Sequence, residues 1–140
     1  MFSHVTLGTN DLKKSLSFYR PFLKAVGWEL KFTEEHWAGW MPPIGDRPLF
    51  ILTTPVDERP ATVGNGAMVA FDCANREVVV RAYDLALSLG ACDEGAPGLR
   101  PEYHPDYFGA YLRDLDGNKL CLCCHAYEHP QRASSPLTAV

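Results

Sequence analysis

Apolar and polar positions follow two periodicities in the first half of the chain. Residues 4–7 have the short apolar pattern of a strand, and residues 11–26 place apolar side chains at helical spacing until Gly27. Three strand-like runs follow at 28–33, 37–41 and 49–53, separated by Pro and Gly turn signals. This half is therefore predicted to form a βαβββ unit, closed by Pro55.

The same order begins again after residues 57–66, a polar connection rich in Pro and Gly that has no periodicity. Residues 67–71 predict a strand, 76–89 predict a helix ended by Gly90, and 91–94 predict another short strand.

A long segment rich in Pro, Gly and Tyr then leads into a predicted hairpin. Its strands are 109–113 and 119–124, and the turn between them contains Asp116-Gly117, a strong turn signal. Residues 129–140 are mostly Pro, Ser and Ala with little to bury, so we expect a disordered tail.

The two halves can be aligned with each other as an internal repeat. The alignment places His4 over Met68, Gly27 over Gly90, Gly39-Trp40 over Ala110-Tyr111, and 49–52 over 119–122. Each unit leaves one sheet face uncovered by its helix, so two copies are expected to enclose a space between them. The prediction is an α+β domain over 1–128, in which two tandem βαβββ modules (1–56 and 65–128) form curved mixed sheets around a cavity.

Charge and composition exclude several classes of partner. The net charge is -4 and no run of Lys or Arg could neutralise phosphates, so neither nucleic acid nor a membrane surface is an expected partner. No apolar stretch is long enough for a membrane span and no export signal is recognisable. We expect a cytoplasmic protein whose five Cys stay reduced.

Several short motifs carry a family resemblance that spans residues 3–125. Ser3-His4-Val5-Thr6-Leu7, Asp11-Leu12 and Phe18-Tyr19 resemble the first unit of the glyoxalase, bleomycin-resistance and extradiol-dioxygenase (vicinal oxygen chelate) superfamily. Gly95-Ala96-Pro97-Gly98, Tyr103-His104-Pro105, Gly109 to Asp114 and Asp116 to Leu120 resemble its glyoxalase-like subgroup. The resemblance implies the two-module fold, a small-molecule ligand and a homodimer.

The resemblance also implies four positions for metal ligands, namely His4, Met68, Ile51 and Cys121. Of these, His4 alone is the residue type usual in the family. Ile51 offers no lone pair, and a thioether is a poor ligand for hard divalent ions. We therefore expect a degenerate metal site, no cofactor and no glyoxalase I activity. The alternatives for Met68 and Cys121 are a softer site, suited to Cu(I) or Zn, and simple packing in the cavity.

The other candidate site residues lie in the second half or on the third strand-like run. Tyr103, His104 and Tyr107 belong to the long segment before 109–113 and are the candidate catalytic residues of a lid. His104 is either an acid or base, or a group that caps the loop. The candidate ligand-binding residues are His4, Met68, Cys121, Trp40 and Tyr111.

Two aromatic and thiol patterns leave further choices open. Trp37 and Trp40 are three residues apart on one strand, so only one of them is expected to reach the cavity. Cys121, Cys123 and His125 share one strand face, but at a spacing too wide for tetrahedral zinc.

The function suggested by the resemblance is lyase or isomerase chemistry on a small oxygenated metabolite. The alternative is a non-catalytic protein that sequesters a drug or metabolite, as bleomycin-resistance members do. An enzyme requires a group that moves a proton, whereas a sequestering protein requires only shape and stacking.

Overall fold

The computed structural model describes residues 1–127, and these form two modules with the same order of elements. The first module consists of β1 (His4–Gly8), α1 (Leu12–Ala25), β2 (Glu29–Thr33), β3 (Trp37–Met41) and β4 (Leu49–Thr53). The second consists of β5 (Val69–Asp72), α2 (Arg76–Ser88), β6 (Cys92–Leu99), β7 (Phe108–Arg113) and β8 (Lys119–Cys124). The predicted βαβββ repeat is confirmed.

Polar caps and glycines set the helix ends at the expected places. The carboxylate of Asp11 accepts a hydrogen bond from the Lys14 amide, and Asn75 accepts one from the Val78 amide. After the last turn of each helix, Gly27 (φ 87°) and Gly90 (φ 105°) adopt the left-handed conformation that reverses the chain.

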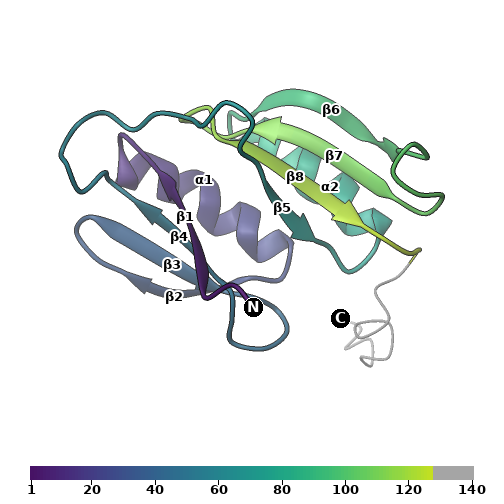
Figure 1. The fold of residues 1–140 in the computed structure, drawn as a ribbon, viewed down its shortest axis with the longest axis horizontal. Coiled ribbons are helices and arrows are strands. Elements are labelled where there is room, and N and C mark those ends of the chain that lie inside the picture. The colour runs from purple at the N-terminus through teal and green to yellow at the C-terminus, as the bar shows by residue number, and fades with distance from the viewer. Residues whose placement is uncertain (128–140) are drawn as a thin grey trace.

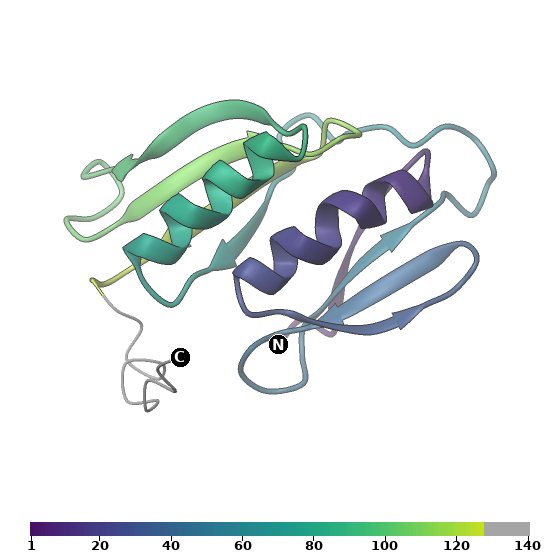
Figure 2. The ribbon, with the colours of Figure 1, turned by 180° about the vertical axis from the view of Figure 1, so that it is seen from behind.

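Each module forms a four-stranded mixed sheet, with order β1-β4-β3-β2 in the first and β5-β8-β7-β6 in the second. The pairs β1/β4 and β5/β8 are parallel, and the remaining pairs are antiparallel. The modules lie side by side with β1 and β5 in the middle (Figure 1). Both helices cover the same side, which faces the viewer in Figure 2. We call the opposite, uncovered side of the two sheets the open face.

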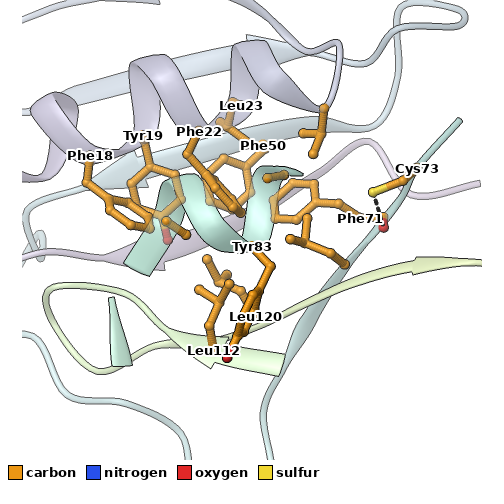
Figure 3. Close-up of a cluster of buried hydrophobic side chains, with 14 of the residues drawn as sticks. Phe18, Tyr19, Phe22, Leu23, Phe50, Phe71, Cys73, Tyr83, Leu112 and Leu120 are labelled. Carbon is orange, nitrogen blue, oxygen red and sulfur yellow. Dashed lines mark hydrogen bonds between the residues drawn. The ribbon is translucent and has the colours of Figure 1, made fainter. Parts of the chain in front are cut away.

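An aromatic cluster on the helix side joins the two modules. Phe71 of β5 lies in edge contact with Phe22 of α1 and Phe50 of β4, at centroid separations of 6.1 and 5.3 Å (Figure 3). It also contacts Trp28 at 5.5 Å. Phe71 is therefore a residue of the second module that packs in the core of the first, so the two modules share one hydrophobic core.

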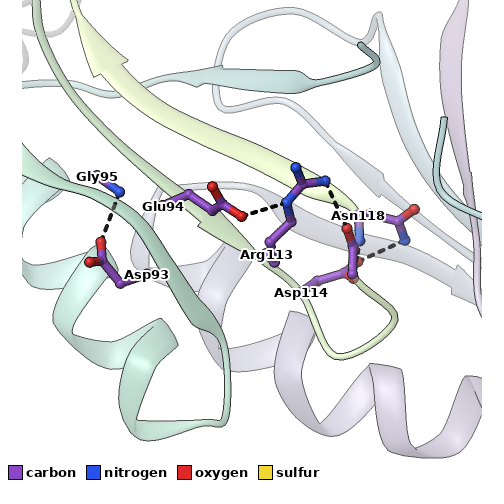
Figure 4. A network of polar contacts seen from close by, with 7 residues as sticks. Asp93, Glu94, Gly95, Arg113, Asp114 and Asn118 are labelled. Atoms are coloured by element: carbon purple, nitrogen blue, oxygen red, sulfur yellow. Dashed lines mark hydrogen bonds and ion pairs between the residues drawn. The ribbon is translucent and has the colours of Figure 1, made fainter. Parts of the chain in front are cut away.

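A buried carboxylate connects the modules at one end of this core. Asp114, after β7, accepts a 2.5 Å hydrogen bond from the Tyr19 hydroxyl of α1. It also accepts hydrogen bonds from the backbone and side-chain amides of Asn118 (Figure 4), whose side chain donates to the Gly8 carbonyl of β1. Burial raises the pKa of Asp114, while these donors favour its charged form.

Two boundaries in the second module differ from the sequence prediction. Strand β6 extends to Leu99, five residues beyond the predicted end at residue 94, because two register shifts against β7 let the chain stay paired through its glycines. The unpaired segment is consequently limited to residues 100–107. Strand β5 begins at Val69, so Met68 lies immediately before it.

The predicted alignment of the repeat is wrong by one residue on the third strand. Gly39 pairs with Ile51 and Tyr111 pairs with Cys121, so the equivalent of Tyr111 is Gly39. A shift of one residue reverses the face of a strand. Trp40, only 1% exposed, therefore lies in the core near Tyr19, on the opposite side of the sheet from the face predicted for it.

None of the helices within residues 1–127 is long and apolar enough to cross a membrane. The predicted tail, 129–140, lies outside the described residues.

Candidate functional site

Strand alternation places one set of β4 and β8 side chains on the open face. Phe50, Leu52, Leu120 and Leu122 belong to the core beneath the helices, so the residues between them, Ile51 and Cys121, point to the other side. Register pairs them with Thr6 of β1 and Ala70 of β5. The two modules therefore present Ile51 and Cys121 at equivalent places.

The positions predicted for ligand contact differ widely in exposure. His4 is exposed, and its Nδ1 lies 3.0 Å from the Ser3 hydroxyl. Met68 is 44% exposed, whereas Ile51 is 6% exposed and Cys121 is fully buried. The four side chains thus range from fully buried to exposed.

A cavity of about 330 Å³ lies where the two modules meet. Thr6 and Gly8 of β1, Met68, and Lys119 of β8 contribute to its lining together with residues 62–64 of the connection. Met68 is the one predicted site residue in this lining. A second cavity, of about 560 Å³, is formed mainly by residues 53–60 and contains none of the predicted site residues.

Tyrosine and cysteine side chains form a hydrogen-bonded cluster on the open face of the second module. The Tyr107 hydroxyl lies 3.0 Å from the Tyr111 hydroxyl and 3.4 Å from the Cys121 sulfur. The ring of Tyr107 lies over Gly109, where an added Cβ would meet it at 2.8 Å. Segment 100–107 thus brings Tyr107 onto β7 and β8, and glycine at position 109 leaves room for the ring.

A second polar chain extends from the same segment to the end of β8. The Asp106 amide donates to Nδ1 of His104, which leaves the His104 proton on Nε2 in the neutral ring. Nε2 lies 3.0 Å from Nδ1 of His125, whose own proton is then on Nε2, 3.9 Å from the Cys123 sulfur. The hydrogen bonds therefore run in one direction, from segment 100–107 through His104 and His125 to the Cys123 sulfur.

Tyr103 does not share in these polar contacts. Its side chain is 64% exposed, and its ring packs edge-on against Tyr107 at 5.1 Å. The structure therefore brings His104 and Tyr107 to the cluster and places Tyr103 outside it, as packing for the Tyr107 ring.

The pKa values of the two thiols move apart because the thiols are hydrogen-bonded neighbours on the same face of β8. The hydrogen bond from Cys123, together with those from Tyr107 and Tyr111, lowers the pKa of Cys121 to about 7, although burial opposes the change. The same contact with Cys121, together with burial, raises the pKa of Cys123. Burial raises the pKa of Tyr107. Near neutral pH about half of the Cys121 thiol is therefore ionised, and it lies next to donors that keep their protons.

Two cations flank the ring of Tyr111. The Arg100 guanidinium and the Lys119 ammonium each lie 5.7 Å from its centre. Lys119 also lines the cavity between the modules, so the cavity and the cluster are neighbours on the open face. Arg100 further lowers the pKa of Cys121 through its charge.

Comparison with known proteins agrees with the fold and the repeat. A sequence model of the glyoxalase/bleomycin resistance protein/dioxygenase superfamily matches residues 1–122. The chain belongs to this superfamily. A glyoxalase/bleomycin resistance protein from Albidiferax ferrireducens has 34% identity and a TM-score of 0.78, over 89% of this chain and 98% of that chain.

Two less similar solved structures share the fold. A glyoxalase-related enzyme from Fulvimarina pelagi has 17% identity and a TM-score of 0.69, covering 89% of this chain and 87% of that one. A lactoylglutathione lyase from Agrobacterium tumefaciens has 18% identity and a TM-score of 0.63, covering 88% of this chain and 92% of that one. A search of curated proteins finds no match.

The residues at the superfamily's metal positions do not fit a hard divalent ion. Ile51 has no donor atom, Met68 offers a thioether, and Cys121 is engaged with Tyr107. Within residues 1–127 no three His, Cys, Asp or Glu side chains are grouped so that they could hold one ion.

Sequence reasoning placed Cys123 and His125 on the strand face of Cys121 but assigned neither of them, nor Arg100, to the cluster. The period of two along β8 was the available signal for the first two, because it places them on the face of Cys121. Their partners come from segment 100–107, whose path over the sheet depends on tertiary packing. Arg100 had no signal beyond its charge.

Proposed function

We propose that this superfamily member is an enzyme that moves a proton within a small oxygenated metabolite, in a lyase or isomerase reaction, without the metal usual in the family. The observation that carries this proposal is the Tyr111–Tyr107–Cys121 chain, with a hydroxyl pair at 3.0 Å and a hydroxyl–sulfur contact at 3.4 Å. Cys121 stands at a position that the resemblance assigns to a metal ligand. In its thiolate form, its sulfur would accept a hydrogen bond from Tyr107.

The direction of hydrogen bonding supports a base acting through the tyrosines. When Cys121 is a thiolate, Tyr107 donates to its sulfur, and Tyr111 is left to donate to the Tyr107 oxygen. A substrate C–H or O–H group next to Tyr111 can give its proton to the Tyr111 oxygen as the two hydroxyl protons each move one place. Cys121 ends as a thiol, and the reverse movement returns the proton to a neighbouring substrate atom.

The pKa of Cys121 suits this role, because a general base works best when its pKa lies near the working pH. The buried thiolate is also kept away from competing acids in solvent. His104 and His125 approach the other thiol, Cys123, and give the pair a connection to bulk water.

Charge near the cluster indicates the class of metabolite. Arg100 and Lys119 each lie 5.7 Å from the centre of the Tyr111 ring that the substrate would contact, and Lys119 also belongs to the adjacent cavity. Arg113 is already paired with Glu94 at 2.9 Å. A small carboxylate-bearing 2-oxo or 2-hydroxy compound fits these two cations, because neither forms an ion pair with a carboxylate within residues 1–127.

The test follows hydrogen exchange in a panel of small 2-oxo and 2-hydroxy acids and aldehydes by proton NMR in deuterated buffer. We expect wild-type protein, treated with a chelator, to exchange or convert at least one compound. Tyr107→Phe and Cys121→Ser should each reduce the rate by roughly a hundredfold or more.

Tyr127→Phe is the matched tyrosine control, because Tyr127 is exposed and contacts Arg76 instead of the cluster. Compounds that bind without exchange or conversion would contradict the enzyme proposal and favour sequestration. Activity that disappears with the chelator and returns with a divalent metal would contradict the metal-free mechanism.

A further inference from the structure

Two thiols of β8 occupy the open face, in contrast to the other buried cysteines. Cys121 and Cys123 alternate with the core residues Leu120, Leu122 and Cys124, so their sulfurs lie on the side away from the helices. Cys121 is fully buried and Cys123 is 4% exposed. A pair of thiols is thus held on the face where the ligand cavity and segment 100–107 lie.

Each of these sulfurs has a separate hydrogen-bond donor. The Tyr107 hydroxyl lies 3.4 Å from Cys121, and Nε2 of His125 lies 3.9 Å from Cys123. Because both donors are contacted or supplied by segment 100–107, through Tyr107 and His104, the thiol pair depends on that segment for its surroundings.

We propose that Cys121 is a site of reversible oxidation by small hydroperoxides, and that Tyr107 covers and activates it. The thiolate sulfur attacks one peroxide oxygen and the O–O bond breaks. With hydrogen peroxide the departing hydroxide takes a proton from a neighbouring donor, and the products are cysteine sulfenic acid and water. The second thiol and Tyr107 are the donors within reach.

Size and cover favour a hydroperoxide over larger electrophiles. Most side chains of 100–107 are exposed, and three of them, Arg100, His104 and Tyr107, contact β7, β8 or the residue that follows β8. A small movement of this segment would admit a molecule of a few atoms to Cys121. Thiolate character is what makes a cysteine susceptible to peroxide, and a neighbouring thiol is a common feature of such sites.

Oxidation would also change the segment that covers the thiol. An oxygen added to the Cys121 sulfur would occupy the 3.4 Å space now bridged by the Tyr107 hydroxyl. Tyr107 would have to move, and its contact with Tyr111 would be lost. A peroxide signal would thereby reach the open face of the second module.

The experiment treats the full-length reduced protein with graded hydrogen peroxide, traps sulfenic acid with dimedone, and locates the label by peptide mass spectrometry. We expect Cys121 to be labelled before Cys92, although Cys92 is exposed and Cys121 is buried. A small thiol added before dimedone should prevent the label by reducing the sulfenic acid. Preferential labelling of Cys92, with Cys121 left reduced, would overturn the proposal.

Variants separate the contribution of Tyr107 from general access. Tyr107→Phe keeps the covering ring and removes the donor, so labelling at neutral pH should slow roughly tenfold, as one pKa unit implies. Tyr103→Phe is the matched control, because Tyr103 packs on the same ring without a side-chain hydrogen bond to sulfur. Equal rates for Tyr107→Phe and wild type would also overturn the proposal. The labelling measures no turnover, so the proposed oxidation of Cys121 can fail while the proposed proton transfer holds, and the reverse.

Discussion

The two modules have one scaffold and two different open faces. Register places Ile51 opposite Gly39 in the first module and Cys121 opposite Tyr111 in the second. Above Gly39 the space is filled by the ring of Phe32, which would lie 2.4 Å from an added Cβ. In the first module the Phe32 ring thus covers the space over Gly39. In the second module the equivalent space holds tyrosine hydroxyls and the Cys121 thiol.

The connection between the second and third strands explains much of this difference. In the first module β2 and β3 are joined by residues 34–36, whereas β6 and β7 are joined by 100–107. The longer segment supplies Tyr107 and His104, and a short turn has no reach over the sheet. A duplicated scaffold therefore acquires chemistry in one copy through a longer loop and a few side chains on one strand face.

The largest expected effect comes from breaking the aromatic connection between the modules. Phe71→Ala should lower the free energy of unfolding by about 3–5 kcal/mol, because it leaves a cavity between α1, β4 and β5. Urea denaturation followed by fluorescence would measure it. Phe2→Ala, at an exposed position, is the control and should change stability by less than about 0.5 kcal/mol. A small effect at Phe71 would mean that the modules do not depend on a common core.

The next effect concerns the thiol itself. Ile51→Cys places a thiol at the equivalent position without the Tyr107, Tyr111 and Cys123 donors. The lowered pKa of about 7 means that the Cys121 thiolate forms as the pH rises through 7, well below an ordinary thiol. At neutral pH the thiolate fraction should differ roughly tenfold to a hundredfold.

Ultraviolet thiolate absorbance, measured as a function of pH, tests this difference by subtraction of Cys121→Ser from wild type. The thiol introduced by Ile51→Cys is measured in the Cys121→Ser background. If the two thiols titrated at the same pH, the hydrogen-bond donors around Cys121 would have no effect on its pKa.

A smaller effect is expected from the glycines that admit aromatic rings. Gly39→Ala should cost about 1–3 kcal/mol by forcing Phe32 from its place, and Phe32→Ala in the same chain should remove that cost. Gly109→Ala instead displaces Tyr107, so it should raise the apparent pKa of Cys121. Denaturant melts and the thiolate titration would show whether each glycine serves its own module in this way.

The smallest effect is expected at the ion pair of the second module. Glu94 and Arg113 lie 2.9 Å apart but are partly exposed (Figure 4), so Glu94→Gln should change stability by about 0–1 kcal/mol. The thiolate titration should be unchanged. A shift in that titration would show that charges at the edge of β6 reach the cluster.

Periodicity was sufficient to predict the repeat, the helix ends and the open face, because each depends on local patterns of apolar residues, caps and glycines. It was insufficient for the alignment of the third strand. Trp40 and Tyr111 were aligned by their similar chemistry, yet hydrogen-bond register places Gly39 at the position of Tyr111. A one-residue error exchanges core and open face, and composition alone does not correct it.

The residues of the candidate site could be predicted only where a local pattern or the repeat marks them. Segment 100–107 could be singled out by its length and aromatic residues, and Cys121 by the repeat. The contact between His104 and His125 joins residues 21 positions apart, through a fold of the segment that no local pattern specifies. Tyr103, which resembles Tyr107 in sequence, proved to be exposed packing.

The sealed face of the first module has a consequence for laboratory evolution. Ile51, Gly39 and Phe32 occupy the place in the first module that is equivalent to the tyrosine–cysteine cluster, without its polar groups, and the core beneath them belongs to different residues. Combinatorial libraries at these three positions, with a lengthened β2–β3 turn, could install a new activity there while leaving the original cluster untouched. The first module therefore offers a separate position for redesign, distinct from the cluster of the second module.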